Sequence, residues 1–234
     1  MSVLENNNAE PVLRVSSLGI RIQGQTILEN ISFELKGGTT LAVMGPNGAG
    51  KTMLFKALLN LIPHTGEVKW AENVKVGYVP QNITTVDIPI SVKEFLSFRN
   101  GENIEECLSA VRLDSESIRD KGLGTLSGGQ LRRVLIAWAL IDGPNVLLFD
   151  EPTTGVDLDS EEPIFRMLDD LKKRTKITML LITHDVHIVR EYSDYLLALN
   201  KCLTYFGESK DIMNPQVQKY IYGETVCIRA ENHD

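Results

Sequence analysis

The chain has 234 residues, of which 43% are hydrophobic and 24% charged, so it can bury a core without disulfide or metal staples. Its 24 Lys and Arg against 31 Asp and Glu give a formal net charge of −7, which argues against non-specific binding to nucleic acid. No apolar run approaches the roughly 18 residues of a membrane-spanning helix, and the three cysteines are far apart without zinc-binding spacing, so we expect a cytoplasmic globular protein in a reducing compartment.

The hydrophobic pattern of the N-terminal part of the chain predicts strands, followed by a loop and a helix. Residues 1–10 are rich in Asn and Glu and predict a flexible tail. Apolar runs alternate with polar residues over 13–35, which is typical of antiparallel strands. The continuous apolar run at 41–44 predicts a strand buried on both faces. A helical pattern follows at 51–61, and the Pro, Thr and Gly within 63–66 predict its end.

The rest of the chain alternates strands with helices, apart from one interruption. Residues 74–79 predict a strand, whereas 82–124 are polar with apolar residues at helical spacing. The segments after it are a helix from about Gln130, a strand at 146–149, a helix at 160–174 and a strand at 178–183. Such alternation predicts a mostly parallel sheet covered by helices.

These elements predict an α/β fold in a single domain over residues 11–225. An antiparallel β-subdomain begins the domain, and a helical subdomain at about 82–143 is inserted into it. Residues 226–234 are expected to form a C-terminal tail.

A Gly-rich segment follows the first buried strand and leads into a helix. It fits the P-loop spacing G-x-x-x-x-G-K-[ST] with Gly45, Pro46, Asn47, Gly48, Ala49, Gly50, Lys51 and Thr52. Backbone N–H groups and the helix N-terminus can then cradle phosphates, with Lys51 on the β- and γ-phosphates and Thr52 on Mg²⁺. A ligand-free Gly-rich turn is the alternative, but the strand before it and the helix after it favour the phosphate site.

Two carboxylates and a histidine come at the ends of later strands. Asp150 ends the strand at 146–149, where parallel α/β sheets bind ligands, and is placed to hold Mg²⁺. Glu151 comes next and could accept a proton from an attacking water. His184 follows another apolar strand and could contact the γ-phosphate. A solvated turn is the alternative for the carboxylates, and a structural role is the alternative for the histidine.

A second phosphate-ready helix start lies at residues 127–130. Ser127 is an N-cap candidate, Gly128 and Gly129 leave backbone N–H groups uncovered, and Gln130 follows. An ordinary capped helix is the plain interpretation. Two half-sites on one chain, however, suggest a head-to-tail homodimer that encloses two ATP molecules, each between one P-loop and the opposite Ser127 segment.

With these motifs in this order, nearly the whole chain resembles the ATP-binding-cassette (ABC) ATPases. Residues 45–52 resemble the Walker A motif, 126–130 the LSGGQ signature and 146–150 Walker B. The Q-loop glutamine, the D-loop aspartate and the switch histidine correspond to Gln81, Asp157 and His184. The resemblance implies a P-loop NTPase fold and ATP hydrolysis with Mg²⁺.

The resemblance also implies roles and partners. Gln81 would link Mg²⁺ and the attacking water to the helical subdomain, and Lys51, Glu151 and His184 would serve hydrolysis. The helical subdomain would receive integral membrane permease subunits, so the chain would lie peripherally on the inner face of the cell membrane. Ile22 takes the place of the aromatic residue that usually stacks on adenine, which predicts looser base binding.

A finer resemblance concerns cargo. Residues 76–81, 88–92, 151–157 and 198–202 are similar to the zinc and manganese uptake subgroup, especially the zinc ATPases. This implies import of a divalent metal, delivered indirectly by a metal-binding substrate protein. The alternatives are an ABC ATPase for another cargo, a soluble ABC ATPase uncoupled from transport, and a nucleotide-gated interaction module.

Overall fold

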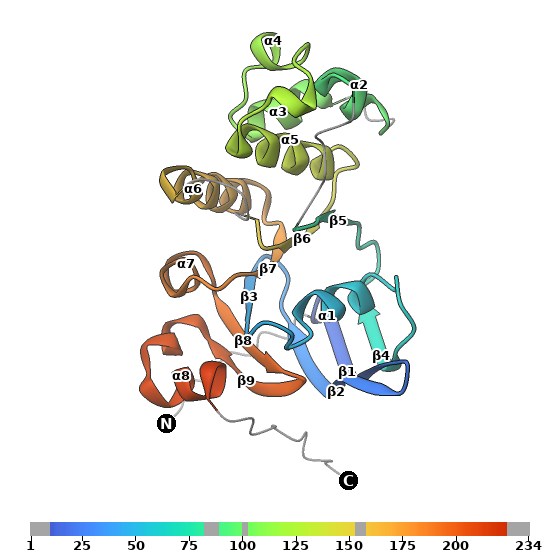
Figure 1. Ribbon diagram of the computed structural model, residues 1–234, viewed down its shortest axis with the longest axis vertical. Coiled ribbons are helices and arrows are strands. Elements are labelled where there is room, and N and C mark those ends of the chain that lie inside the picture. Colours follow the sequence, from blue (N-terminus) through green and yellow to red (C-terminus); the bar gives the residue numbers. More distant parts are fainter. Residues whose placement is uncertain (1–9, 82–88, 100–102, 153–157, 224–234) are drawn as a thin grey trace.

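The computed structural model describes residues 10–81, 89–99, 103–152 and 158–223. They form a three-stranded sheet, a six-stranded sheet and helices around them. In Figure 1 the three-stranded sheet forms the lower right part of the molecule, and helices α2 to α5 lie at its upper end.

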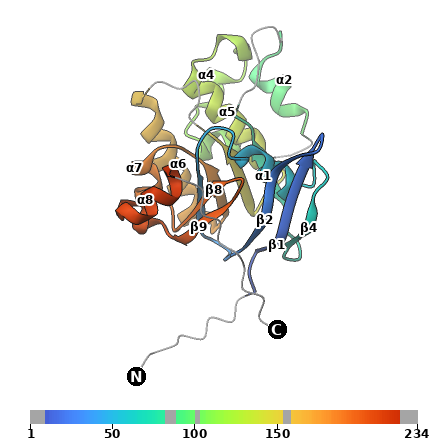
Figure 2. The same ribbon diagram turned by 60° about the horizontal axis from the view of Figure 1, so that its bottom comes forward.

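The three-stranded sheet is antiparallel and has the order β2-β1-β4. Its strands are β1 (Leu13–Ile22), β2 (Gln25–Leu35) and β4 (Thr65–Trp70). A tight turn joins β1 to β2, and its residues Gln23 and Gly24 both have positive φ, 49° and 80°. Figure 2 shows the three strands side by side. The antiparallel strands predicted over 13–35 are confirmed.

The six-stranded sheet has the order β5-β6-β7-β3-β8-β9, and only β9 runs antiparallel to its neighbour. The strands are β3 (Thr40–Met44), β5 (Val76–Val79), β6 (Val146–Asp150), β7 (Thr178–Ile182), β8 (Tyr195–Asn200) and β9 (Cys202–Glu208). Every residue of β3, β6 and β7 is buried, as the continuous apolar runs predict.

Alternate residues of these strands pack into different cores. Leu148 and Ile182 face the core shared with helix α1 (Lys51–Leu58) and the smaller sheet. Phe149 and Leu181 face the core shared with helices α5 (Gly128–Leu140) and α6 (Leu158–Thr175). Helices α7 (Val186–Tyr192) and α8 (Pro215–Tyr222) cover the part of the sheet around β8.

The inserted helices lie between β5 and β6 in the chain. They are α2 (Val92–Ser97), α3 (Ile104–Ala110), α4 (Ser115–Ile118), the 3₁₀ turn η1 (Leu123–Thr125) and α5. The fold class is therefore confirmed: an α/β core, an antiparallel β-subdomain and an inserted helical subdomain. The domain boundaries at 11–225 and 82–143 stay predictions, and the predicted tails fall almost wholly outside the described residues.

Three expectations about local structure need correction. Helix α1 ends at Leu58 rather than near 61, because Asn60 takes a left-handed conformation with φ 54°. The segment expected only to end that helix begins strand β4 at Thr65. The cysteines were expected to indicate a reducing compartment. Cys107 is a buried free thiol, but Cys202 is disulfide-bonded, so the cysteines do not support that expectation.

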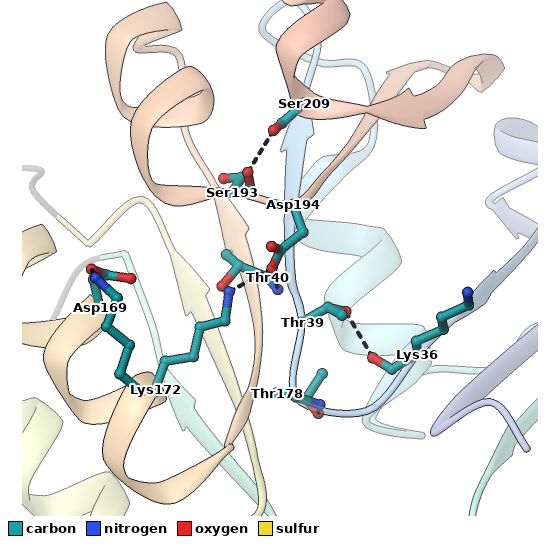
Figure 3. Close-up of polar contacts among 11 residues, drawn as sticks. Lys36, Thr39, Thr40, Asp169, Lys172, Thr178, Ser193, Asp194 and Ser209 are labelled. Carbon is teal, nitrogen blue, oxygen red and sulfur yellow. Dashed lines mark hydrogen bonds and ion pairs between the residues drawn. The ribbon is translucent and has the colours of Figure 1, made fainter. Parts of the chain in front are cut away.

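A polar network joins the sheet to helix α6 near the start of β3 (Figure 3). One oxygen of Asp194, Oδ2, accepts hydrogen bonds from the backbone N of Thr40 at 2.7 Å and from Lys172 Nζ at 2.5 Å. The backbone N of Asp194 donates in return to the Thr40 carbonyl at 2.9 Å. Thr40 is only 2% exposed, so its N–H depends on the Asp194 carboxylate for a partner.

Candidate active site

The sequence-predicted site residues of the core follow the carboxyl ends of adjacent parallel strands. Strand β3 leads to the Gly-rich loop, β5 to Gln81, β6 to Asp150 and Glu151, and β7 to His184. The strand register aligns Val79 with Phe149 and Asp150 with Ile182, so these ends lie at one edge of the sheet. That edge is where open α/β sheets bind ligands.

The loop between β3 and α1 depends on glycine at two positions. Gly45 has φ 148°, and a Cβ there would lie 1.9 Å from the carbonyl oxygen of Leu199. Gly50 has φ 97° and immediately precedes α1, where a Cβ would lie 2.5 Å from Leu28 Cδ2. Only glycine fits both positions without displacing neighbours. The backbone N–H groups at the start of α1 are then available to an anion.

Lys51 is held inside this loop. Its Nζ donates to the carbonyls of Gly45 and Pro46 at 2.9 and 3.0 Å, and the residue is only 7% exposed. Burial lowers the pKa of Lys51, and the nearby Glu151 and Asp150 carboxylates oppose that shift. The loop therefore presents a buried cation, bound to backbone, on the side where phosphates would lie.

Two oxygen ligands suited to Mg²⁺ meet beneath the loop. Thr52 Oγ1 lies 3.3 Å from Asp150 Oδ1, and the hydroxyl of Tyr78 lies 3.4 Å from Asp150 Oδ2. Asp150 is 2% exposed, and burial raises its pKa. Burial and the carboxylate together raise the pKa of Tyr78 to about 12, so the phenol stays a donor. A hydroxyl and a carboxylate in a polar, buried corner are the hard ligands that Mg²⁺ prefers.

Glu151 is held by two other predicted residues. Its Oε2 accepts a hydrogen bond from Gln81 Nε2, and its Oε1 lies 3.2 Å from His184 Nε2. Its backbone has φ 50°, the left-handed conformation that non-glycine residues rarely adopt. The structure thus brings together all three side chains, from the ends of β5, β6 and β7.

A cleft of about 290 Å³ lies against this cluster. Its lining is Ile27, Asn47, Gly48, Ala49, Gly50, Lys51, Thr52, Met53, Gln81 and Glu151. Ile22, the predicted adenine neighbour, is 42% exposed at the end of β1 and is not part of this lining. Ile27, on β2, supplies an aliphatic side chain to this lining and was not predicted from the sequence. No local pattern marks it, because β2 reaches the P-loop only in the folded chain.

The second predicted phosphate site lies at the start of α5, away from the cleft lining. Ser127 Oγ accepts from the backbone N of Gln130 at 3.2 Å, and Gln130 Oε1 accepts from the backbone N of Ser127 at 3.1 Å. The capping role of Ser127 is therefore confirmed as a capping box, with Gly128 and Gly129 in the first turn. Asp157 lies outside the described residues.

Arg132, one turn into α5, was also not predicted from the sequence. This arginine is only 4% exposed and donates to the carbonyls of Pro80, Gln81 and Glu151 at 2.9, 3.0 and 3.2 Å. Its signal was a charged residue at a position that the helical periodicity assigns to the buried face of α5, together with Gly129 and Ile136.

Comparison with known proteins identifies the family to which this site belongs. The profile described as ABC transporter matches residues 28–154, which include the P-loop, the inserted helices and the β6 carboxylates. The chain belongs to the ABC transporter family. Within this family it is an ABC ATPase, which binds ATP and couples ATP hydrolysis to transport. Among the described residues, no helix is long and apolar enough to cross a membrane.

Individual relatives cover most of this ABC ATPase. It is 36% identical over 219 residues to zinc import ATP-binding protein ZnuC 1 of Hahella chejuensis, covering 92% of this chain and 85% of that one. It is 31% identical to zinc import ATP-binding protein ZnuC of Haemophilus influenzae, covering 97% and 85%.

Solved structures support the same fold. The chain resembles cbiO1 of Clostridium perfringens, part of the ABC transporter complex cbiONQ, with TM-score 0.77 and 26% identity over 89% of this chain and 92% of that one. A nucleotide-free ATP-binding cassette from an ABC transporter matches with TM-score 0.78 and 23% identity over 92% and 100%, a likeness of fold alone.

Proposed function

We propose that this ABC ATPase is the nucleotide-binding subunit of a zinc importer. The contact of Glu151 with Gln81 and His184, beside the P-loop cleft, carries the hydrolysis part of the proposal. The cargo part is supported by the relatives named for zinc import, which match more than nine-tenths of the chain at 31–36% identity.

In this proposal the residues at the edge of the six-stranded sheet bind different parts of ATP and Mg²⁺. The backbone N–H groups of 45–52 and the Lys51 ammonium bind the β- and γ-phosphates. Thr52 and Asp150 hold Mg²⁺, with Gln81 near it, and Mg²⁺ when bound neutralises charge on the phosphate oxygens. Ile22 and Ile27 offer aliphatic packing to the adenine in place of an aromatic ring.

Glu151 is the proposed general base. A water oxygen attacks the γ-phosphorus, the bond from that phosphorus to the bridging oxygen of ADP breaks, and Glu151 accepts the water proton. His184 donates to the γ-phosphate, and Gln81 orients the water. For this reaction the carboxylate must exchange its hydrogen bonds with Gln81 and His184 for one with the water.

The site is completed by a second copy of the chain. We propose a head-to-tail homodimer in which Ser127, Gly128, Gly129 and Gln130 of one subunit bind the γ-phosphate held by the P-loop of the other, with Asp157 at the same interface. The support is the exposed helix start at Ser127, which already presents backbone N–H groups at the first turn of α5.

The proposed complex lies at the membrane. The ATPase would bind integral membrane permease subunits through its helical subdomain, on the inner face of the cell membrane, and a separate metal-binding protein would deliver the metal. The similar protein cbiO1, which is part of a transporter complex, supports a permease partner.

Growth under metal limitation tests this proposal. A host lacking this chain is grown with a chelator, and zinc or manganese is returned singly, with the parental chain or Glu151→Gln supplied. We expect only the parental chain to restore growth at limiting zinc. If growth is restored only at limiting manganese, the proposed cargo is manganese rather than zinc. If growth does not depend on the chelator, metal import is refuted.

A further inference from the structure

Arg132 is a buried charge without a role in the hydrolysis just described. It lies on α5, in the helical subdomain, and is 4% exposed. Burial lowers the pKa of its guanidinium, and the negative charge of Asp150 opposes that shift. A buried guanidinium is costly unless hydrogen bonds satisfy its donors, so its partners indicate what it holds in place.

Those partners are backbone carbonyls of the two loops that carry Gln81 and Glu151. Nη1 donates to the Pro80 carbonyl at 2.9 Å, and Nη2 donates to the carbonyls of Gln81 and Glu151 at 3.0 and 3.2 Å. A single nitrogen therefore bridges two loops that are 70 residues apart in sequence. The side chains of Gln81 and Glu151 also contact each other, so the three residues form a closed ring of hydrogen bonds.

The backbone of Glu151 needs such support. Its φ of 50° is disfavoured for a residue with a Cβ, and the surrounding structure must hold it there. Its N–H donates to the Ile182 carbonyl at 3.2 Å, and its own carbonyl accepts from Arg132. Both polar groups of this strained residue are thus fixed, which sets the direction of its carboxylate toward the cleft.

We propose that Arg132 is a positioning residue for ATP hydrolysis, which holds the backbones of Gln81 and Glu151 in register from the helical subdomain. This positioning role rests on the proposed role of Glu151 as the general base. Arg132 contacts neither ATP nor the attacking water. Because it belongs to α5, a displacement of the helical subdomain that breaks these hydrogen bonds releases Gln81 and Glu151 from their alignment.

The test compares steady-state ATP hydrolysis of Arg132→Lys and Arg132→Gln with the parental chain. The matched control is Arg119→Gln, whose arginine is 39% exposed in the same subdomain. A lysine cannot span the three carbonyls in one plane, so we expect kcat to fall about tenfold in Arg132→Lys and about a hundredfold in Arg132→Gln. The KM for ATP should stay within about twofold because the P-loop is untouched, and the control should match the parental chain.

A cycle with Glu151→Gln separates positioning from general loss of structure. If Arg132 acts by aligning the Glu151 carboxylate, adding Arg132→Lys to Glu151→Gln should lower the residual kcat much less than Arg132→Lys lowers the kcat of the parental chain. The proposal would be overturned if the fold-losses in kcat of the two single variants multiplied fully in the double variant. It would also be overturned by a parental kcat in Arg132→Lys, or by equal changes in kcat and KM. If Arg132→Gln does not fold, Arg132→Lys carries the test alone.

Glu151→Gln, measured in the same assay, keeps the two proposals apart. Loss of turnover in Glu151→Gln with an unchanged Arg132→Lys refutes the positioning role and leaves the base intact. Parental turnover in Glu151→Gln refutes the base and with it the positioning role.

Discussion

Replacing Glu151 with glutamine should abolish turnover while leaving the site otherwise intact. The two side chains have the same shape, and the amide of glutamine can meet both neighbours of the native carboxylate. Its oxygen can accept from Gln81 Nε2, and its NH₂ group can donate to His184 Nε2, which lies 3.2 Å from the native carboxylate, once the imidazole carries its proton on Nδ1. The left-handed backbone at φ 50° is no more strained with glutamine than with glutamate.

The size of the loss follows from what the amide lacks. Glutamine cannot accept the proton of the attacking water, and removing a general base costs about 10²- to 10⁴-fold in rate. That range equals about 3 to 5 kcal/mol in the activation free energy. In the proposed function phosphate binding rests on Lys51 and the loop backbone, so ATP affinity should change less than about twofold.

The assay is phosphate release under saturating Mg²⁺ and ATP, with nucleotide affinity measured separately by equilibrium titration. A variant that hydrolyses ATP at the parental rate would refute the assignment of the base. A variant that loses affinity and turnover together would show that the substitution disturbs the cleft rather than the proton transfer.

Four further outcomes are expected. Lys51→Ala should weaken ATP binding by at least about tenfold, because a charge-assisted contact to phosphate is lost, and undiminished affinity in a titration would refute the phosphate cradle. Asp150→Asn should stabilise the nucleotide-free protein at neutral pH. Burial raises the pKa of the folded Asp150, so its ionised form destabilises the fold above that pKa and the difference shrinks as pH falls through it. Unfolding titrations at several pH values measure this, and equal stability at all of them would contradict it. Ser127→Arg should prevent ATP-dependent dimerisation seen by light scattering while the monomer stays folded, at a cost of about 1 kcal/mol for the lost cap. Asp194→Ala should lower the free energy of unfolding by about 2 kcal/mol because it leaves the buried Thr40 N–H unpaired, whereas Asp194→Asn keeps an acceptor and should cost less.

The elements that could be predicted from sequence are those whose pattern is local. Strand β3 is a continuous apolar run, and the glycines after it are required by backbone geometry at Gly45 and Gly50. Strand β4 was not predicted because it forms through pairing with β1 rather than through a local apolar pattern. Only two of its six residues, Val68 and Trp70, are partly buried hydrophobic residues. Gly66 marks a close approach to Ser17 rather than a chain break.

The site divides in the same way. Motif spacing found Lys51, Asp150 and Glu151 because each belongs to one strand and the turn after it. Spacing could not predict the contacts of Glu151 with residues 81 and 184, since these join the ends of three strands. Nor could it assign Arg132, whose partners lie 52 and 19 residues away in the sequence.

The proposed function makes zinc uptake depend on ATP hydrolysis at Glu151. The initial rate of radioactive zinc uptake tests this dependence in cells that carry the permease and either the parental chain, Glu151→Gln or no chain. We predict that the parental chain restores uptake and that Glu151→Gln stays at the rate without the chain, although both proteins bind ATP. Uptake with Glu151→Gln at the parental rate would refute the role of Glu151, and no gain with the parental chain would refute zinc import.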